Sequence, residues 1–110
     1  MQRTNERRRQ ARMKLKGYRA DIADGPLVFV GTIQDISLEG FCLNDLPDRF
    51  AIKGKSYRVV ISGGSNSTPY KMTVFPRWRR INQFSMDVGF KITEAPERWV
   101  EFVREQQEKK

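Results

Sequence analysis

The segment Phe84-Ser85-Met86-Asp87-Val88-Gly89-Phe90-Lys91-Ile92 alternates apolar residues with polar or small ones along its whole length. A period of two predicts a β-strand with one buried and one exposed face, and Phe84 begins the row predicted to be buried. Residues 57–61 and 70–74 repeat this alternation. Residues 62–69, which lie between them, are all common in turns, so we predict that these two strands form a hairpin.

Three further strands complete the predicted sheet. Residues 27–36 and 41–43 are rich in aliphatic and aromatic side chains, and the turn 37–40 separates them. A first strand is predicted from about residue 13 to residue 22, before the turn Asp24-Gly25-Pro26. Six short strands at these intervals favour a mainly β domain, either a small closed barrel or a sandwich, because closure removes exposed strand edges.

The C-terminal residues follow a different period. Pro96 suits the first position of a helix, and Trp99, Phe102 and Val103 follow at spacings of three and four residues. We therefore predict a helix over residues 96–107. Its single apolar stripe predicts that it packs on the barrel, with Trp99 in the core.

Composition excludes most catalytic chemistry. The chain has 110 residues, no histidine and one cysteine, Cys42, so histidine-activated nucleophiles, multi-ligand zinc sites and an internal disulfide are excluded. We expect no enzyme activity, no metal and no cofactor. The N-terminal residues lack the apolar core of a signal peptide, and the longest aliphatic and aromatic run covers only residues 27–30. A cytoplasmic protein without membrane insertion is expected.

Most of the net charge of +8 lies at the N-terminus. Residues 1–19 hold eight basic side chains and one acidic one, whereas residues 20–110 hold 13 basic and 12 acidic ones. A nearly neutral domain therefore carries a basic arm. Such an arm indicates an anionic partner, because arginine presents a planar set of donors that matches phosphate oxygens. The alternative is a solvated tail that serves only solubility.

Two short motifs stand in order around the predicted strands. The arm contains an Arg-x-x-x-Arg element, Arg8-Arg9-Gln10-Ala11-Arg12, and a predicted strand ends in the segment Asp35-Ile36-Ser37-Leu38-Glu39-Gly40. With residues 87–91 closing the sheet, the chain resembles the PilZ domain family, bacterial receptors for the second messenger cyclic di-GMP. The resemblance implies a six-stranded antiparallel barrel of the split-barrel type with a C-terminal helix. It divides a single domain, 1–110, into a flexible arm (1–12), a barrel (13–92) and the helix.

The resemblance places the ligand between the arm and the barrel, and the side chains suit that role. Arg8 and Arg12 can donate two hydrogen bonds each to phosphate oxygens or to guanine O6 and N7. Asp35 can accept from guanine N1–H and N2–H, and Ser37 can bond the neighbouring polar edge or a phosphate. Gly40 can adopt a positive φ and let the backbone approach the ligand. The alternative for Asp35, Ser37 and Gly40 is ordinary turn chemistry.

Two further residues complete the predicted ligand set. In PilZ domains an arginine at the position of Arg7 is associated with a stacked pair of ligand molecules. Trp78 is the best candidate to stack on a guanine, as a tryptophan near this strand does in some members. The alternative places Trp78 in the core, because it continues the inward phase of residues 70, 72 and 74. Pro76 indicates an edge or a bulge that could shift this phase.

We therefore expect a receptor that binds cyclic di-GMP, orders its arm and so signals to an unidentified partner protein. In the PilZ family such outputs concern motility, biofilm formation and virulence. One alternative is a basic β-barrel that binds single-stranded nucleic acid, whose affinity would fall steeply with salt, whereas that of a dianionic ligand would fall gently. Another is a PilZ-like interaction module that binds no ligand.

Overall fold

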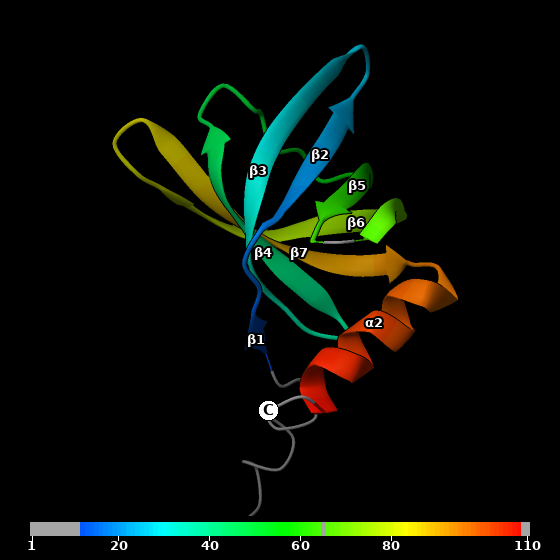
Figure 1. Ribbon diagram of the computed structural model, residues 1–110. Coiled ribbons are helices and arrows are strands. Elements are labelled where there is room, and N and C mark those ends of the chain that lie inside the picture. The colour runs from blue at the N-terminus through cyan, green and yellow to red at the C-terminus, as the bar shows by residue number, and fades with distance from the viewer. Residues whose placement is uncertain (1–11, 65, 109–110) are drawn as a thin grey trace, which may run out of the picture.

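The computed structural model describes residues 12–64 and 66–108 (Figure 1). The predicted ligand-binding residues Arg7 and Arg8 lie outside this part of the chain. The elements in chain order are β1 (Met13–Lys14), β2 (Tyr18–Asp24), β3 (Leu27–Ile36), β4 (Gly40–Pro47), β5 (Tyr57–Gly63), β6 (Asn66–Ile81), β7 (Ser85–Glu94) and α2 (Glu97–Glu108).

Strands β2 to β7 form one antiparallel sheet that closes on itself. Neighbouring strands follow the order β3, β2, β5, β6, β7, β4, and β4 pairs again with β3. The short strand β1 lies beside the end of β3, where Met13 pairs with Ile36 and Lys14 with Asp35. The predicted mainly β barrel with a C-terminal helix is confirmed, with β1 as one additional strand. Closure gives each strand of the ring two hydrogen-bonded neighbours.

The core is built from the inward rows of the barrel strands. Met86, Val88 and Phe90 of β7 are buried, as their alternation predicts. On β5 and β6 the cross-strand partners Ile61 and Tyr70 are buried as well. Burial of these apolar side chains stabilises the barrel by roughly 1.5 to 3 kcal/mol for each large side chain.

Helix α2 packs on the barrel through its apolar stripe. Trp99 is completely buried, and its ring centroid lies 5.2 Å from that of Tyr70 in an edge-on arrangement. Val103, one turn further along the helix, is also buried, so the predicted core role of Trp99 is confirmed. Figure 1 shows α2 at the same end of the barrel as β1. No helix within residues 12–64 and 66–108 is long and apolar enough to cross a membrane.

Two predicted boundaries are wrong because glycines change the chain direction. The single strand expected over residues 13–22 is interrupted at Gly17, whose φ of 82° separates β1 from β2. The turn expected over residues 62–69 is shorter, because β6 already begins at Asn66, paired with Gly63. Gly64 adopts a φ of 62°, and a Cβ there would lie 2.3 Å from the Tyr18 hydroxyl oxygen. A side chain at this turn would have to displace the end of the Tyr18 ring, and the positive φ also favours glycine there.

The predicted burial of Phe84 is also wrong. Phe84 is 79% exposed and lies just before β7, in the turn where the Asn82 amide donates to the Ser85 carbonyl at 2.8 Å. The β6–β7 hairpin projects beyond the barrel (Figure 1), so no core exists for the outer end of the apolar row to enter. The alternation is correct from Met86 onward.

Candidate ligand-binding site

The turn between β3 and β4 is held together by Ser37. Its buried hydroxyl oxygen accepts from the amides of Glu39 and Gly40 at 3.3 and 3.2 Å, and the hydroxyl donates to the Gly40 carbonyl at 3.3 Å. The Ser37 amide donates to the same carbonyl at 2.8 Å. The structure thus shows the local turn role that was the alternative for Ser37. These bonds fix the shape of the corner from which β4 begins.

Gly40 is required at this corner because two strands approach closely. A Cβ on Gly40 would lie 2.2 Å from the Phe90 carbonyl oxygen of β7. Gly40 is not among the glycines with positive φ, so the expectation of a positive φ is wrong. The absent side chain instead lets the backbone of β4 lie against β7, where Gly40 pairs with Lys91.

Arg12 and Asp35, which we predicted as separate ligand contacts, contact each other. The Arg12 Nη1 atom donates to Asp35 Oδ1 at 2.5 Å. Arg12 is half-exposed and directly precedes β1, whose Lys14 pairs with Asp35 of β3. The ion pair therefore holds the arginine near the corner formed by Ser37 and Gly40. Among residues 12–64 and 66–108, this contact engages one oxygen of Asp35 and one of the five guanidinium N–H donors of Arg12, and no other partner engages the remaining four.

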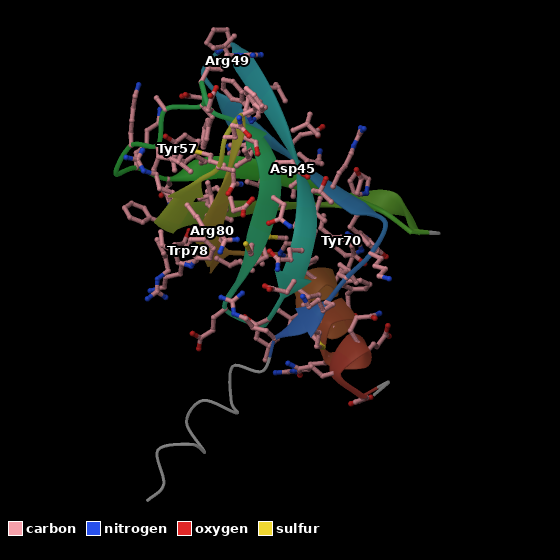
Figure 2. The ribbon with its side chains drawn as sticks, turned by 90° about the vertical axis from the view of Figure 1, so that its left-hand side faces the viewer. Asp45, Arg49, Tyr57, Tyr70, Trp78 and Arg80 are labelled. Atoms are coloured by element: carbon pink, nitrogen blue, oxygen red, sulfur yellow. The ribbon has the colours of Figure 1, made fainter. Side chains whose placement is uncertain are left out.

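Trp78 lies on the outside of the barrel, so the alternative that placed it in the core is wrong. The pairing of β6 with β7 shifts between Pro76, opposite Phe90, and Trp78, opposite Gly89. This bulge reverses the inward phase of β6, as Pro76 suggested. The indole is 45% exposed and covers Gly89, where a Cβ would lie 2.2 Å from the indole nitrogen. Figure 2 shows Trp78 on the same flank as Arg80, which also comes from β6.

These features enclose one polar pocket of about 260 Å³. Four predicted residues line it together: Arg12, Ser37, Gly40 and Trp78. Asp35 is not among the lining residues and reaches the site through Arg12. The remaining lining residues, which the sequence did not identify, are Glu39, Arg77, Gly89 and Phe90. The proline beside Arg77 and Trp78 was the one signal that could have identified Arg77, because it predicted a bulge there.

A larger hollow of about 690 Å³ lies elsewhere, on the outer face of β2, β5 and β6. Its lining mixes aliphatic side chains such as Val28 and Val60 with Asp21, Arg58 and Lys71. It contains none of the predicted ligand-binding residues. We assign the site to the smaller pocket because, of these two hollows in the described part of the chain, it is the one that combines an arginine, a hydrogen-bonded turn and an exposed aromatic surface.

Two buried titratable groups, Asp87 and Cys42, lie on β7 and β4, the strands that also carry the pocket residues Gly89 and Gly40. Burial would raise the pKa of Asp87, but hydrogen bonds from the side chains of Arg80 and Asn82 and from the Asp45 amide lower it below its usual value. Arg80 Nη2 lies 2.8 Å from Asp87 Oδ2. Burial, followed by the negative charges of Asp35 and Asp87, raises the pKa of Cys42 to about 11. Cys42 is therefore a neutral thiol at physiological pH and a poor nucleophile.

The barrel matches a solved structure from Bacillus subtilis, the inhibitor of motility MotI/DgrA, with a TM-score of 0.75 at 15% sequence identity. The fold is PilZ-like. The match covers all of this chain and 54% of that protein, so the chain spans about half the length of its structural neighbour. Comparison of the sequence with models of protein families and with curated proteins finds no match.

Proposed function

We propose that this protein is a receptor for cyclic di-GMP and that the pocket of about 260 Å³ holds part of the ligand. The observation that supports this most directly is the meeting of Arg12, the Ser37–Gly40 turn and Trp78 in one pocket. These residues come from three separate parts of the chain. The PilZ resemblance implies that all of them contact one ligand, and they could do so only if the fold brought them together. A cyclic dinucleotide needs cations for its phosphates and a flat surface for a purine, and this pocket offers both.

The position of each residue in or beside the pocket suggests its part in ligand binding. A guanine stacks on the exposed indole of Trp78, a contact worth roughly 1 to 3 kcal/mol. Arg12 donates to a phosphate through N–H groups that Asp35 does not use. Asp35 acts as a positioning residue, because its ion pair sets the direction of Arg12. Ser37 and Gly40 shape the corner, and the chain needs no catalytic group for binding.

The pocket is small for the whole ligand. Sites for small molecules usually measure about 300 to 1,000 Å³. A pocket of about 260 Å³ suits one nucleotide half of the messenger. We propose that Arg7 and Arg8 supply further contacts from the basic arm and that a stacked ligand pair is accommodated between arm and barrel. Ordering of the arm on binding then changes the surface offered to a partner protein in the cytoplasm.

Motility control is one proposed output, because the structural neighbour MotI/DgrA is an inhibitor of motility. Biofilm formation and virulence are further outputs that the PilZ resemblance implies. The partner protein would recognise the arm in its ligand-bound arrangement. This order of events makes binding of the messenger the first step to test.

Isothermal titration calorimetry with cyclic di-GMP tests the proposal, with Arg12→Ala as the variant and Lys16→Ala as its control. Both changes remove one positive charge from an exposed side chain, but only Arg12 lines the pocket. A charged hydrogen bond worth about 1.5 to 3 kcal/mol predicts a loss of about 10- to 150-fold for Arg12→Ala. Lys16→Ala should stay within about twofold of the wild type, as expected for an exposed charge that does not line the pocket.

Failure of the wild type to bind the messenger at micromolar concentrations would refute the proposal. Equal losses in the two variants would show that net charge, and not the pocket, determines affinity. A repeat of the titration at several salt concentrations adds a check on ligand class. Tighter binding of single-stranded oligonucleotides than of cyclic di-GMP, with an affinity that falls steeply with salt, would favour the nucleic-acid alternative.

A further inference from the structure

We infer that Arg77 determines base specificity in this pocket by donating hydrogen bonds to O6 and N7 of the guanine stacked on Trp78. The inference rests on the proposed function, because it assumes that a guanine occupies the pocket. It concerns a residue that the Arg-x-x-x-Arg and Asp-x-Ser-x-x-Gly motifs do not contain.

The β-bulge of β6 brings Arg77 to the site. In a regular strand neighbouring side chains point to opposite faces, so Arg77 and Trp78 would be separated by the sheet. A bulge instead sets two residues of one strand opposite a single residue of the next. Pro76 pairs with Phe90 and Trp78 with Gly89, which leaves Arg77 as the additional residue. Arg77 and Trp78 accordingly line the same pocket.

Three arginines of β6 differ in ways that single out Arg77. Arg80 is engaged with the buried carboxylate of Asp87 at 2.8 Å. Arg79 is exposed and does not line the pocket. Arg77 lines the pocket and has no hydrogen bond or ion pair with any residue in the described part of the chain. Its guanidinium donors are therefore available to a ligand.

The edge of a base stacked on Trp78 determines which acceptors are available to the guanidinium donors of Arg77. A purine lying on an indole presents its edges sideways, toward residues that flank the platform. The planar guanidinium matches the paired acceptors O6 and N7 of guanine. Adenine carries an amino donor in place of O6, so the same arginine would favour guanine over adenine. Arg12 remains free for phosphate, and the two arginines divide the recognition of the ligand between them.

The test compares two ligands across three proteins by calorimetry. The ligands are cyclic di-GMP and its 7-deazaguanine analogue, in which C–H replaces N7. The proteins are the wild type, Arg77→Ala and, as the matched control, Arg79→Ala. Both arginines are exposed on the same strand, and melting curves establish that each variant folds like the wild type.

Arg77→Ala should bind cyclic di-GMP about 10- to 100-fold more weakly, the range for loss of a bidentate contact to a base. Arg79→Ala should match the wild type. The wild type and Arg79→Ala should each bind the deaza analogue more weakly than they bind cyclic di-GMP. Arg77→Ala should bind the two ligands with equal affinity. The two losses would then be non-additive, as expected for groups that interact.

An equal penalty for the deaza analogue in the wild type and Arg77→Ala would overturn the assignment of Arg77 to the base edge. Unchanged affinity of Arg77→Ala for cyclic di-GMP would overturn it as well, while leaving the proposed function intact. Absence of binding by the wild type would overturn the proposed function and this inference together.

Discussion

Two glycines at the site, Gly40 and Gly89, should respond differently to replacement by alanine. Gly40→Ala should mainly reduce stability and Gly89→Ala should mainly reduce ligand affinity, although the added Cβ would meet a neighbouring atom at the same distance in both. A Cβ at Gly40 would lie 2.2 Å from the Phe90 carbonyl oxygen, and a Cβ at Gly89 would lie 2.2 Å from the Trp78 indole nitrogen. Non-bonded heavy atoms need a separation of roughly 3.5 Å from a carbon atom, so each of these distances must increase by more than 1 Å. The cost depends on whether the opposing atom can move.

At Gly40 the opposing atom belongs to the backbone of β7, where the β4–β7 pairing begins with Gly40 opposite Lys91 and Phe41 opposite Phe90. Relief of the clash must separate the two strands or break ladder hydrogen bonds. Overpacking costs about 1 to 3 kcal/mol, and each lost ladder bond adds about 1 kcal/mol. We expect Gly40→Ala to reduce the free energy of unfolding by about 3 kcal/mol, which lowers the melting temperature by roughly 10 to 20 °C.

At Gly89 the opposing group is a half-exposed side chain that can swing toward solvent. Gly89→Ala should therefore cost less than about 1 kcal/mol of stability, as most surface changes do. Loss of the stacking position should nevertheless weaken binding of cyclic di-GMP by about 5- to 100-fold, which corresponds to roughly 1 to 3 kcal/mol. The fluorescence of Trp78 should shift to longer wavelength, whereas that of the buried Trp99 should not.

Urea and thermal unfolding measure the stabilities, and calorimetry measures binding. Gly54→Ala provides the control, because a Cβ at Gly54 would meet no atom within 4 Å and its φ is not in the positive region. We expect Gly54→Ala to retain wild-type stability within about 1 kcal/mol. Equal stabilities of Gly40→Ala and Gly54→Ala, or a larger loss of stability for Gly89→Ala than for Gly40→Ala, would refute this reasoning.

Three further outcomes are expected. Because the pKa of Asp87 is lowered in the folded state, its contribution to stability is complete above the pKa of the unfolded chain, near 3.8, and is lost as the pH falls through the lower folded value. The stability gap between the wild type and Asp87→Asn, followed by urea unfolding, should be largest near neutral pH and shrink below about pH 4; a gap that grows on acidification would contradict the ion pair with Arg80. The Cys42 thiol, with a pKa of about 11, should react slowly with an aromatic disulfide reagent in the native protein at pH 8 and fast after unfolding, and rapid native reaction would contradict its burial. Asp35→Ala should weaken binding of cyclic di-GMP less than Arg12→Ala in calorimetry, because it disturbs the direction of the arginine without removing it; an equal or larger loss would mean that Asp35 contacts the ligand directly.

The strands, the hairpins and the helix follow from local patterns in the sequence. Alternation in residues 86–92 and the helical spacing of Trp99 and Val103 specify which side chains must be buried, and burial of apolar surface drives folding whatever the partners are. The two motifs also predicted three residues that share one pocket, Arg12, Ser37 and Gly40, and the search for a stacking surface predicted a fourth, Trp78. The predictions were wrong at Gly17, whose positive φ interrupts the first strand, and at Phe84, which the projecting hairpin holds away from the core. Local patterns do not show what the chain packs against at these positions.

The contacts that give the candidate site its chemistry depend on how distant segments meet. The pairing of Arg12 with Asp35, the approach of Gly40 to β7 and the placement of Trp78 on Gly89 each join residues at least 11 positions apart. The presence of Pro76 indicated a bulge, but only the register of β6 against β7 shows that the bulge brings Arg77 to the same pocket as Trp78. Alternation is a property of one strand, whereas register belongs to a pair of strands. The sequence alone therefore predicted the barrel, and the tertiary structure decided which of its side chains face the pocket.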